Sequence, residues 1–356
     1  MRSFKHSQER IVGGIPMNIL ITGGAGFVGS QVGYYLKKKG HSIYLLDNMS
    51  YGHEDNLTID GEPIGEFIHG DIRKYCDSTL KEKNIEVVLH FAGVAPLPEC
   101  QEDPYNAIDN NVAGTACVLE SCRLAGVKKV VFASTSAVYE NCKKLPFVEH
   151  QDLLNPDLIY SLTKLQSELL CDSFVKNYDM DIVKLRFFNV YGPHQDFERK
   201  HPPLMGYIIK CLLNKTRPTF FSDGKQKRDY VYITDLANMV ECVLNKDGLA
   251  GEVFNVCSGE VKSVREIYDT YQEAFGVYID PVFSNSDKFW NKYSSLFKQP
   301  YSLNRERVIE EVNKFSEGSF EKAENMLGWK PKVGYKQGIN NCVSYALSSR
   351  TRYNMT

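Results

Sequence analysis

The chain has 356 residues, 43% of them hydrophobic and 24% charged, with a formal net charge of −2 at pH 7. These values lie near the averages for soluble globular proteins, so we expect neither a disordered chain nor a nucleic-acid-binding surface, and no run near twenty apolar residues indicates a membrane anchor. Its ten cysteines follow no CxxC spacing, which indicates no metal site and no disulfide framework and fits a reducing cytoplasm.

The first sixteen residues are polar and contain no apolar core. They predict a flexible N-terminal extension over residues 1–16 and not a signal peptide. From Met17, short apolar runs such as "MNILITG", "SIYLLD" and "VVLHFAG" alternate with amphipathic stretches. This alternation predicts an α/β fold, with a Rossmann-type, doubly wound parallel sheet and helices on both faces.

The alternation breaks after about Gly192 into Pro-bearing and aromatic segments. We therefore expect a sheet domain over residues 17–190, with a returning segment at about 228–258. A smaller C-terminal lobe is expected to occupy mainly residues 191–350 and to bind a substrate.

The stretch "TGGAGFVGS" follows the first strand directly and opens into an amphipathic helix. Gly23 suits the tight turn, Gly26 lets the backbone approach a pyrophosphate, and Gly29 allows close packing of helix and strand. The helix start at Phe27 and Val28 offers free N–H groups to phosphates. In this context the motif predicts a dinucleotide-binding site.

Asp47 ends the next apolar run, "SIYLLD". A carboxylate there accepts hydrogen bonds from a ribose diol and repels a 2′-phosphate, which favours NAD over NADP. Alternatively, Asp47 only caps the turn that begins at Asn48. On the first interpretation, residues 17–190 form an NAD-binding domain.

Tyr160 and Lys164 stand four residues apart in "YSLTK" and share one face if this segment is helical. A free phenol has a pKa of about 10 and is a poor base at neutral pH. A neighbouring ammonium and a positive nicotinamide ring would both lower that pKa. Thr135, at the end of the run "KVVFAST", offers a hydroxyl that could share a proton with a substrate hydroxyl. These three side chains are the predicted catalytic residues.

With these motifs, the chain resembles the extended short-chain dehydrogenase/reductase family, and within it the NAD-dependent nucleotide-sugar epimerases and dehydratases. The resemblance extends from about Met17 to about Lys332. Its landmarks in chain order are "TGGAGFVGS", "GDI", "HFAGVA", "NNVAGT", "STSAVYE", "YSLTK", "RFFNVYGP", "RDYVYITDL" and "LGWKPK". The resemblance implies NAD as the cofactor and a nucleotide sugar, such as a UDP-sugar, as the substrate.

The resemblance also implies the residues that bind the cofactor. Asp71 and Ile72 would flank the adenine, and Ala92 with Gly93 would line the diphosphate and ribose. The full set that it implies is Gly23, Gly26, Phe27, Val28, Asp47, Asn48, Asp71, Ile72, Phe91, Ala92, Gly93, Asn110, Ser134, Tyr160 and Lys164.

A second set is implied for the substrate. It consists of Thr135, Ser136, Tyr160, Asn189, Phe220 and Arg228. Asn189 and Arg228 would hold the diphosphate, because a guanidinium meets phosphate oxygens in a fork. Arg228 could instead be a surface residue in a basic stretch. Phe220 or Phe221 would pack near the nucleobase.

The stretch "STSAVYE" bears on the type of reaction. Dehydrating relatives carry Asp and Glu directly after the Thr, and decarboxylating relatives commonly keep the Glu, whereas Ser136 and Ala137 stand there in this chain. The stretch is therefore similar to that of epimerases, and we expect epimerisation at C4 of a UDP-hexose, UDP-N-acetylhexosamine or UDP-hexuronate through a transient 4-keto sugar. A decarboxylase or 4,6-dehydratase of the same family, and a non-catalytic NAD-binding protein, are the alternatives.

Two features depart from the family pattern. Glu140 replaces the usual Gly after "VY", and the loop over residues 96–104, "PLPECQEDP", differs from the usual substrate-side loop. Either could indicate an unusual sugar.

The resemblance also implies a homodimer. It would form through the helix after "NNVAGT" and the helix that carries "YSLTK". Their predicted outward apolar stripes include Val118, Cys122, Leu165 and Leu169, although such stripes usually face a core.

Overall fold

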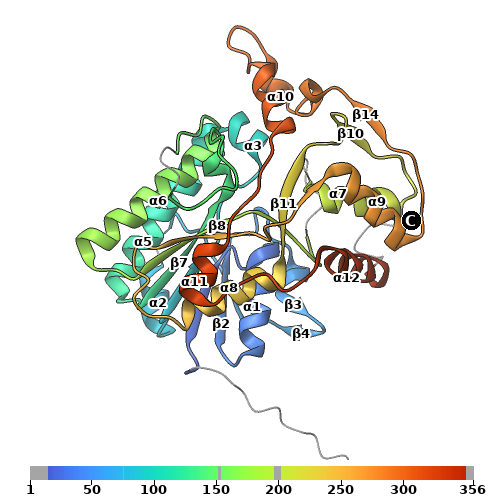
Figure 1. Ribbon diagram of the computed structural model, residues 1–356. Coiled ribbons are helices and arrows are strands. Elements are labelled where there is room, and N and C mark those ends of the chain that lie inside the picture. The colour runs from blue at the N-terminus through green and yellow to red at the C-terminus, as the bar shows by residue number, and fades with distance from the viewer. Residues whose placement is uncertain (1–14, 75, 151–153, 196–201, 350–356) are drawn as a thin grey trace, which may run out of the picture.

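The computed structural model describes residues 15–74, 76–150, 154–195 and 202–349 (Figure 1). The predicted N-terminal extension over residues 1–16 lies outside the described residues, except for its last two. Among the described helices, none is long and apolar enough to cross a membrane.

A central sheet of seven strands confirms the predicted fold class. All neighbouring pairs are parallel. The strands in spatial order are β12 (Val253–Val256), β8 (Ile182–Phe187), β7 (Lys129–Thr135), β6 (Val87–His90), β1 (Asn18–Thr22), β2 (Ser42–Asp47) and β5 (Glu66–His69). The inner strands are buried at nearly every position, as expected for a sheet that is covered on both faces.

Helices cover both faces of this sheet (Figure 1). Ile19 and Ile21 of β1 belong to a core shared with α1 (Phe27–Lys38) and α8 (Ile233–Leu244), whereas Leu20 between them belongs to a core on the other face. That second core includes residues of α2 (Asp77–Glu82), α5 (Gly114–Ala125) and α6 (Ile159–Tyr178). Successive side chains of one strand thus supply the two layers.

Part of the predicted dimer stripe is wrong. Val118 and Cys122 of α5 are 1% and 0% exposed and pack in the core beneath the sheet. Leu165 packs against a small core around Tyr139, and only Leu169 is well exposed, at 60%. The first two residues therefore stabilise the fold and do not face a partner.

The C-terminal lobe combines small sheets with helices. Its three-stranded sheet contains β9 (Asn189–Tyr191), β11 (Lys227–Tyr232) and β13 (Val261–Ser263), and β10 (Thr219–Phe221) pairs with β14 (Val282–Ser284). Its helices are α7 (Leu204–Leu213), α9 (Val264–Phe275), α10 (Arg305–Asn313) and α12 (Tyr335–Ser348). An aromatic core that includes Tyr191, Tyr268 and Tyr271 holds the lobe together.

Short elements connect these parts. They are η1 (Glu54–Leu57), β3 (Thr58–Ile59), β4 (Glu62–Pro63), α3 (Leu97–Glu102), α4 (Pro104–Ile108), the π-helical turn η2 (Asp109–Ala113), and the 3₁₀ turns η3 (Ser136–Tyr139), η4 (Ser286–Lys288) and η5 (Ser294–Phe297).

The chain passes between the lobe and the sheet more than once. After β11, α8 packs beside α1 and β12 joins the edge of the large sheet. Near the C-terminus, α11 (Glu321–Leu327) returns to β12, and the Trp329 indole donates to the Asp235 carbonyl at 3.0 Å. These crossings fix the lobe against the carboxyl ends of the sheet strands.

Candidate active site

The turn after β1 places glycines where a larger residue would collide. Gly23 has φ +70°, and a Cβ there would lie 2.9 Å from the Ala92 nitrogen beyond β6. A Cβ on Gly29 would lie 2.2 Å from the Gly23 oxygen. Strand order reverses between β1 and β6, which is where open parallel sheets bind ligands. Gly26 precedes α1, so the free N–H groups from Phe27 onward lie at this crevice.

Asp47 connects the glycine turn to the loop after β2. Its carboxylate accepts from the Ala25 N–H at 3.0 Å through Oδ2 and from the Met49 N–H at 2.8 Å through Oδ1. The turn-capping role is therefore present. A carboxylate has about four acceptor directions, so two bonds leave acceptor capacity for a ribose diol as well.

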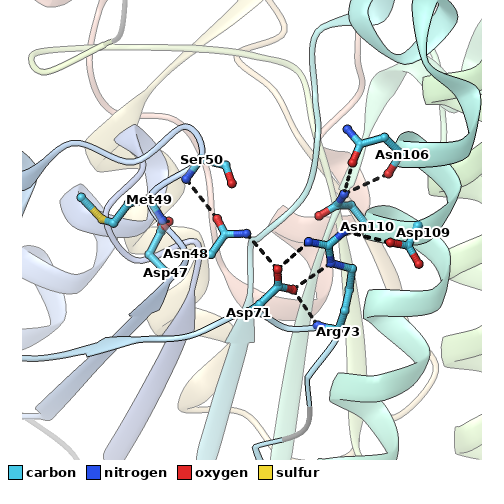
Figure 2. A network of polar contacts seen from close by, with 9 residues as sticks. All are labelled: Asp47, Asn48, Met49, Ser50, Asp71, Arg73, Asn106, Asp109 and Asn110. Atoms are coloured by element: carbon cyan, nitrogen blue, oxygen red, sulfur yellow. Dashed lines mark hydrogen bonds and ion pairs between the residues drawn. The ribbon is translucent and has the colours of Figure 1, made fainter.

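Asp71 stands just after β5 and belongs to the polar network in Figure 2. Nε of Arg73 donates to Asp71 Oδ1 at 2.9 Å, and the Asn48 amide donates to Oδ2 at 3.2 Å. Hydrogen bonding to Arg73 holds the pKa of the Asp71 carboxyl well below its usual range. Nη1 of Arg73 also donates to Asp109 Oδ2 at 2.8 Å. The arginine therefore ties the loop after β5 to the turn η2.

The structure also places three other residues of the predicted cofactor set, Ile72, Phe91 and Asn110. Ile72 is 7% exposed and packs in the core, and Phe91 contacts Phe187 edge to face at a ring distance of 5.8 Å. Asn110 donates to Asn106 Oδ1 at 2.7 Å, as Figure 2 shows.

A buried polar chain runs from β1 to η2 through His90. Thr115 Oγ1 donates its one proton to the Asn111 carbonyl at 2.5 Å, so it must accept from His90 Nε2 at 3.0 Å. His90 Nδ1 is then an acceptor for the Thr22 hydroxyl, 2.7 Å away. Burial lowers the pKa of His90 to about 3, which agrees with a neutral ring protonated on Nε2.

The side chain of Asn111 fixes the loop that follows β6. Its Oδ1 accepts from the Val94 N–H at 2.8 Å, and its Nδ2 donates to the Val94 carbonyl at 2.9 Å and to Thr163 Oγ1 on α6 at 3.1 Å. A Cβ on Gly93 would lie 2.9 Å from Asn111 Oδ1, so a larger residue there would force the Asn111 amide to shift. Asn111 on the π-helical turn η2 therefore connects that turn to the loop after β6 and to α6.

Two of the predicted catalytic residues, Lys164 and Thr135, lie at the carboxyl end of β7. Lys164 lies one turn after the half-buried Tyr160 on α6, and its Nζ donates to the Ala133 carbonyl at 2.9 Å. That carbonyl is two residues before Thr135, whose Oγ1 accepts from the Ala137 N–H at 3.2 Å. Burial lowers the pKa of Lys164 to about 8.

Ser134 is directed away from this group. Its hydroxyl donates to Glu168, which forms a buried ion pair with Arg186 through Nε at 2.9 Å and Nη2 at 2.7 Å. Nη1 of the same guanidinium donates to the Tyr139 hydroxyl at 2.8 Å. Contact between Ser134 and a cofactor would therefore come from its backbone.

On the substrate side, Asn189 and Arg228 lie on adjacent strands of the lobe. The Asn189 amide donates to the Asp229 carbonyl at 2.8 Å, and Nη2 of Arg228 donates to the Glu311 carbonyl on α10 at 2.6 Å. Arg228 is thus bound to α10 and is not a loose surface residue.

Two further cations, Arg307 and Lys314, lie near Arg228. Burial lowers the pKa of Lys314, Glu311 opposes that shift, and the positive charges of Arg228 and Arg307 add to it. We call Arg228, Arg307 and Lys314 the cationic cluster. No sequence motif marks its last two members, so the sequence analysis missed them.

The predicted nucleobase contact needs a correction. Phe220 is 4% exposed and packs edge to face on Tyr268 at a ring distance of 5.3 Å, inside the core of the lobe. Phe221, on the opposite face of β10, is half-buried and contacts Phe289. Successive strand residues face opposite sides, so Phe221 replaces Phe220 as the candidate.

In the part of the chain that the structure describes, no group of three or more His, Cys, Asp or Glu side chains is placed to hold a metal ion. All ten cysteines are free thiols. Burial raises the pKa of Cys100, which shares a small apolar cluster with Tyr160, to about 12, so this thiol is neutral.

A profile of the NAD dependent epimerase/dehydratase family matches residues 19–257. The chain belongs to this family.

Relatives in the family are similar to this protein over nearly the whole chain. A putative UDP-glucose 4-epimerase of Methanocaldococcus jannaschii is 32% identical over 92% of this chain and 97% of its own. The solved UDP-glucose 4-epimerase of Thermotoga maritima with UDP-glucose has a TM-score of 0.81, at 28% identity, and covers 94% of this chain and 100% of that one. The UDP-glucuronic acid 4-epimerase of Bacillus cereus, solved with UDP-glucuronic acid and NAD, has a TM-score of 0.78, at 27% identity over 93% of this chain and 99% of that one.

The crevice of this epimerase/dehydratase family member fits NAD, the cofactor of its family. Gly23 and Gly29 leave space that a Cβ would fill, and the N-terminus of α1 offers N–H groups for a diphosphate. The carboxylate of Asp47 suits a ribose diol and not a 2′-phosphate. Asn48 and Asp71, which are predicted to lie at the adenine end, are hydrogen-bonded to each other.

Sequence reasoning missed several residues of this family member's site. It selected Asn110, whereas its neighbour Asn111 makes the bonds that fix the loop after β6. It assigned no role to His90 or Arg73, although both stand in the quoted landmarks or directly after them. The doublet "NN" did signal an important amide, but only burial distinguishes the two.

Proposed function

We propose that the protein catalyses NAD-dependent epimerisation of a UDP-sugar at C4. One observation carries this proposal: Tyr160 and Lys164 lie one turn apart on α6, Lys164 binds the strand that ends at Thr135, and the two residues after Thr135 cannot ionise. The chain therefore has a base for one hydroxyl and no second acid–base pair at that position. Epimerisation at C4 is the predicted reaction that needs only one such base and no second acid–base pair.

The side chains divide the proton chemistry among them. The Tyr160 oxygen takes the proton of the sugar 4-hydroxyl, and the Lys164 ammonium favours the phenolate by its charge. The Thr135 hydroxyl orients the same sugar oxygen. NAD, when bound, supplies the carbon that accepts and returns a hydride. After the 4-keto sugar has rotated in the pocket to present its other face, Tyr160 returns the proton to the sugar O4.

The cationic cluster supports a diphosphate in the substrate. Arg228 lies on β11, Arg307 lies on α10, and Lys314 directly follows α10. Lys314 interacts electrostatically with both arginines and with Glu140. Asn189 stands on the strand beside β11. We assign these residues to the diphosphate and Phe221 to the base. Relatives solved with UDP-glucose and UDP-glucuronic acid support a UDP-hexose or a UDP-hexuronate.

A decarboxylase or dehydratase remains the second candidate, and Glu140 is the carboxylate that could serve it. Its side chain is 2% exposed and ion-paired with Arg307. A carboxylate held in this way is poorly suited to exchange protons with a sugar, which supports the epimerase.

The test uses a UDP-hexose labelled with deuterium at C4. We expect one product, the C4 epimer, with unchanged mass and the label retained, because the hydride returns to the sugar that released it. NMR identifies the epimer, and mass spectrometry measures the label. A product lighter by water, or by carbon dioxide from a UDP-uronate, contradicts the proposal.

We also propose a cytoplasmic homodimer. The ten free cysteines support a reducing compartment. Exposed apolar side chains on α4 and α6 support the dimer: Tyr105 is 79%, Ile108 46% and Leu169 60% exposed. We expect light scattering to give a dimer at micromolar concentration and Leu169→Glu to give a monomer. Leu347→Glu on α12, with similar exposure at 42%, is the control that stays dimeric. A wild-type monomer refutes the dimer.

A further inference from the structure

Glu140 directly follows the turn η3, which begins after Thr135. It lies between the start of α6 and α10 of the C-terminal lobe. Its N–H donates to the Ala137 carbonyl at 3.0 Å, which closes the turn η3 after Thr135. Its carboxylate is almost fully buried, and burial raises its pKa. A buried carboxylate is costly unless its oxygens are paired, so its partners define its role.

One carboxylate oxygen holds the beginning of the catalytic helix. Glu140 Oε2 accepts from the N–H of Leu158, the residue that precedes α6, at 3.2 Å. The next N–H, that of Ile159, donates to Oε1 of Gln101 on α3 at 3.3 Å. Tyr160 is the following residue. The first N–H groups of a helix have no intrahelical partner, so these two side chains fix the direction in which α6 starts.

The other oxygen holds the lobe. Glu140 Oε1 forms an ion pair with Nη2 of Arg307 on α10. The far end of α10 is held by Arg228, which donates to the Glu311 carbonyl at 2.6 Å. Both arginines belong to the cationic cluster, and Lys314 lies within electrostatic range of both arginines and of Glu140. A single carboxylate therefore contacts the start of α6 and the helix that carries the predicted diphosphate site.

We propose that Glu140 is a positioning residue that couples occupation of the cationic cluster to the placement of Tyr160. The inference rests on the proposed function, since it takes the cluster as the site of the substrate's diphosphate. An anion that fixes α10 also fixes Arg307, and the ion pair transmits this order to Glu140. Glu140 in turn holds the Leu158 N–H, two residues before the catalytic phenol.

Kinetics provide the first part of the test. Misplacement of a reacting group by about 1 Å can cost about 100-fold in rate. We expect kcat to fall on the order of 100-fold in Glu140→Gly and on the order of 10-fold in Glu140→Gln, which keeps an acceptor for Leu158 but loses the charge. KM should change less than kcat, and the bound NAD should be unchanged.

The chain offers a matched control in Glu310. It pairs with Nη1 of the same Arg307 guanidinium but is 61% exposed, whereas Glu140 is buried. Glu310→Gln should therefore leave kcat within about twofold of the wild type, because exposed pairs contribute little. Loss of kcat in Glu310→Gln equal to that in Glu140→Gln overturns the proposal.

Hydrogen exchange provides the second part and requires no turnover. UDP added to the NAD-bound protein should slow exchange of the Leu158 and Ile159 amides in the wild type and in Glu310→Gln, but not in Glu140→Gly or Glu140→Gln. A wild type that epimerises nothing but shows this pattern refutes the proposed reaction and supports the coupling. A wild type that epimerises, with equal slowing in all four proteins and kcat retained in the Glu140 variants, refutes the coupling alone.

Discussion

Tyr160→Phe is expected to lower kcat by about 1,000-fold or more while leaving the fold and the bound NAD intact. General acid–base catalysis contributes roughly 100-fold to 10,000-fold, and the phenol oxygen is the proposed proton acceptor for the 4-hydroxyl. The substitution removes only that oxygen. The ring still packs against the cluster of Val94, Cys100 and Ala107, so the free energy of unfolding should change little.

The measurement is the steady-state rate with the UDP-sugar that the wild type epimerises, together with the NAD absorbance of the purified variant. Tyr178→Phe is the matched control, because Tyr178 lies at the other end of α6 and is 52% exposed. We expect it to retain wild-type kcat. Activity of Tyr160→Phe within tenfold of the wild type would remove Tyr160 from the mechanism.

Sequence predicted the parts of the site that depend on local geometry. The glycine turn could be predicted because Gly23 needs a positive φ and Gly29 must pack against the Gly23 carbonyl. The pair Tyr160 and Lys164 could be predicted because residues four apart share a helix face. Each inference needs only one element and its periodicity.

Parts of the site that depend on contacts between distant segments could not be predicted. Arg307 meets Glu140 across 167 residues of sequence, and no local pattern relates them. The prediction that Val118 and Cys122 face a dimer partner was wrong for a different reason. An apolar stripe on a helix has the same spacing whether it faces the core or a partner, and only the packed structure distinguishes the two.

The choice between Phe220 and Phe221 could not be made from the sequence. Side chains along a strand alternate, so an offset of one residue exchanges a core aromatic for one that faces the other side of β10. The same applies to Asn110 and Asn111, because the first side chain bonds to Asn106 and the second to Val94. Motif position alone does not give the side-chain direction.

Lys164→Met is the second large effect that we expect. The ammonium of Lys164 is buried one turn after Tyr160 on α6. On the proposed mechanism, its positive charge stabilises the phenolate. Removal of that charge raises the pKa of Tyr160. At pH 7 a smaller fraction of the enzyme then carries the base, and we expect kcat to fall on the order of 100-fold.

The pH dependence separates this effect from unfolding. Burial lowers the pKa of Lys164 from 10.5 to about 8, so the unfolded chain binds more protons than the folded one between these values. The wild type therefore gains stability from this group as the pH rises from about 8 to 10.5, and below pH 8 the buried charge costs stability. Lys164→Met removes that cost, so the variant should be no less stable than the wild type at pH 7. Its loss of kcat must then come from the chemistry.

The measurement is kcat as a function of pH for the wild type, Lys164→Met and Lys176→Met. Lys176 lies in the last turn of the same helix and is exposed, so its loss should leave the profile unchanged. In Lys164→Met the acidic limb of the profile should move to higher pH by about one unit or more, because the phenol now ionises without its neighbouring cation. This mechanism predicts partial recovery of kcat at high pH, because the Tyr160 phenol then ionises even without the Lys164 charge. A profile that keeps its acidic limb in place and falls equally at every pH would show that Lys164 positions the cofactor and does not tune Tyr160.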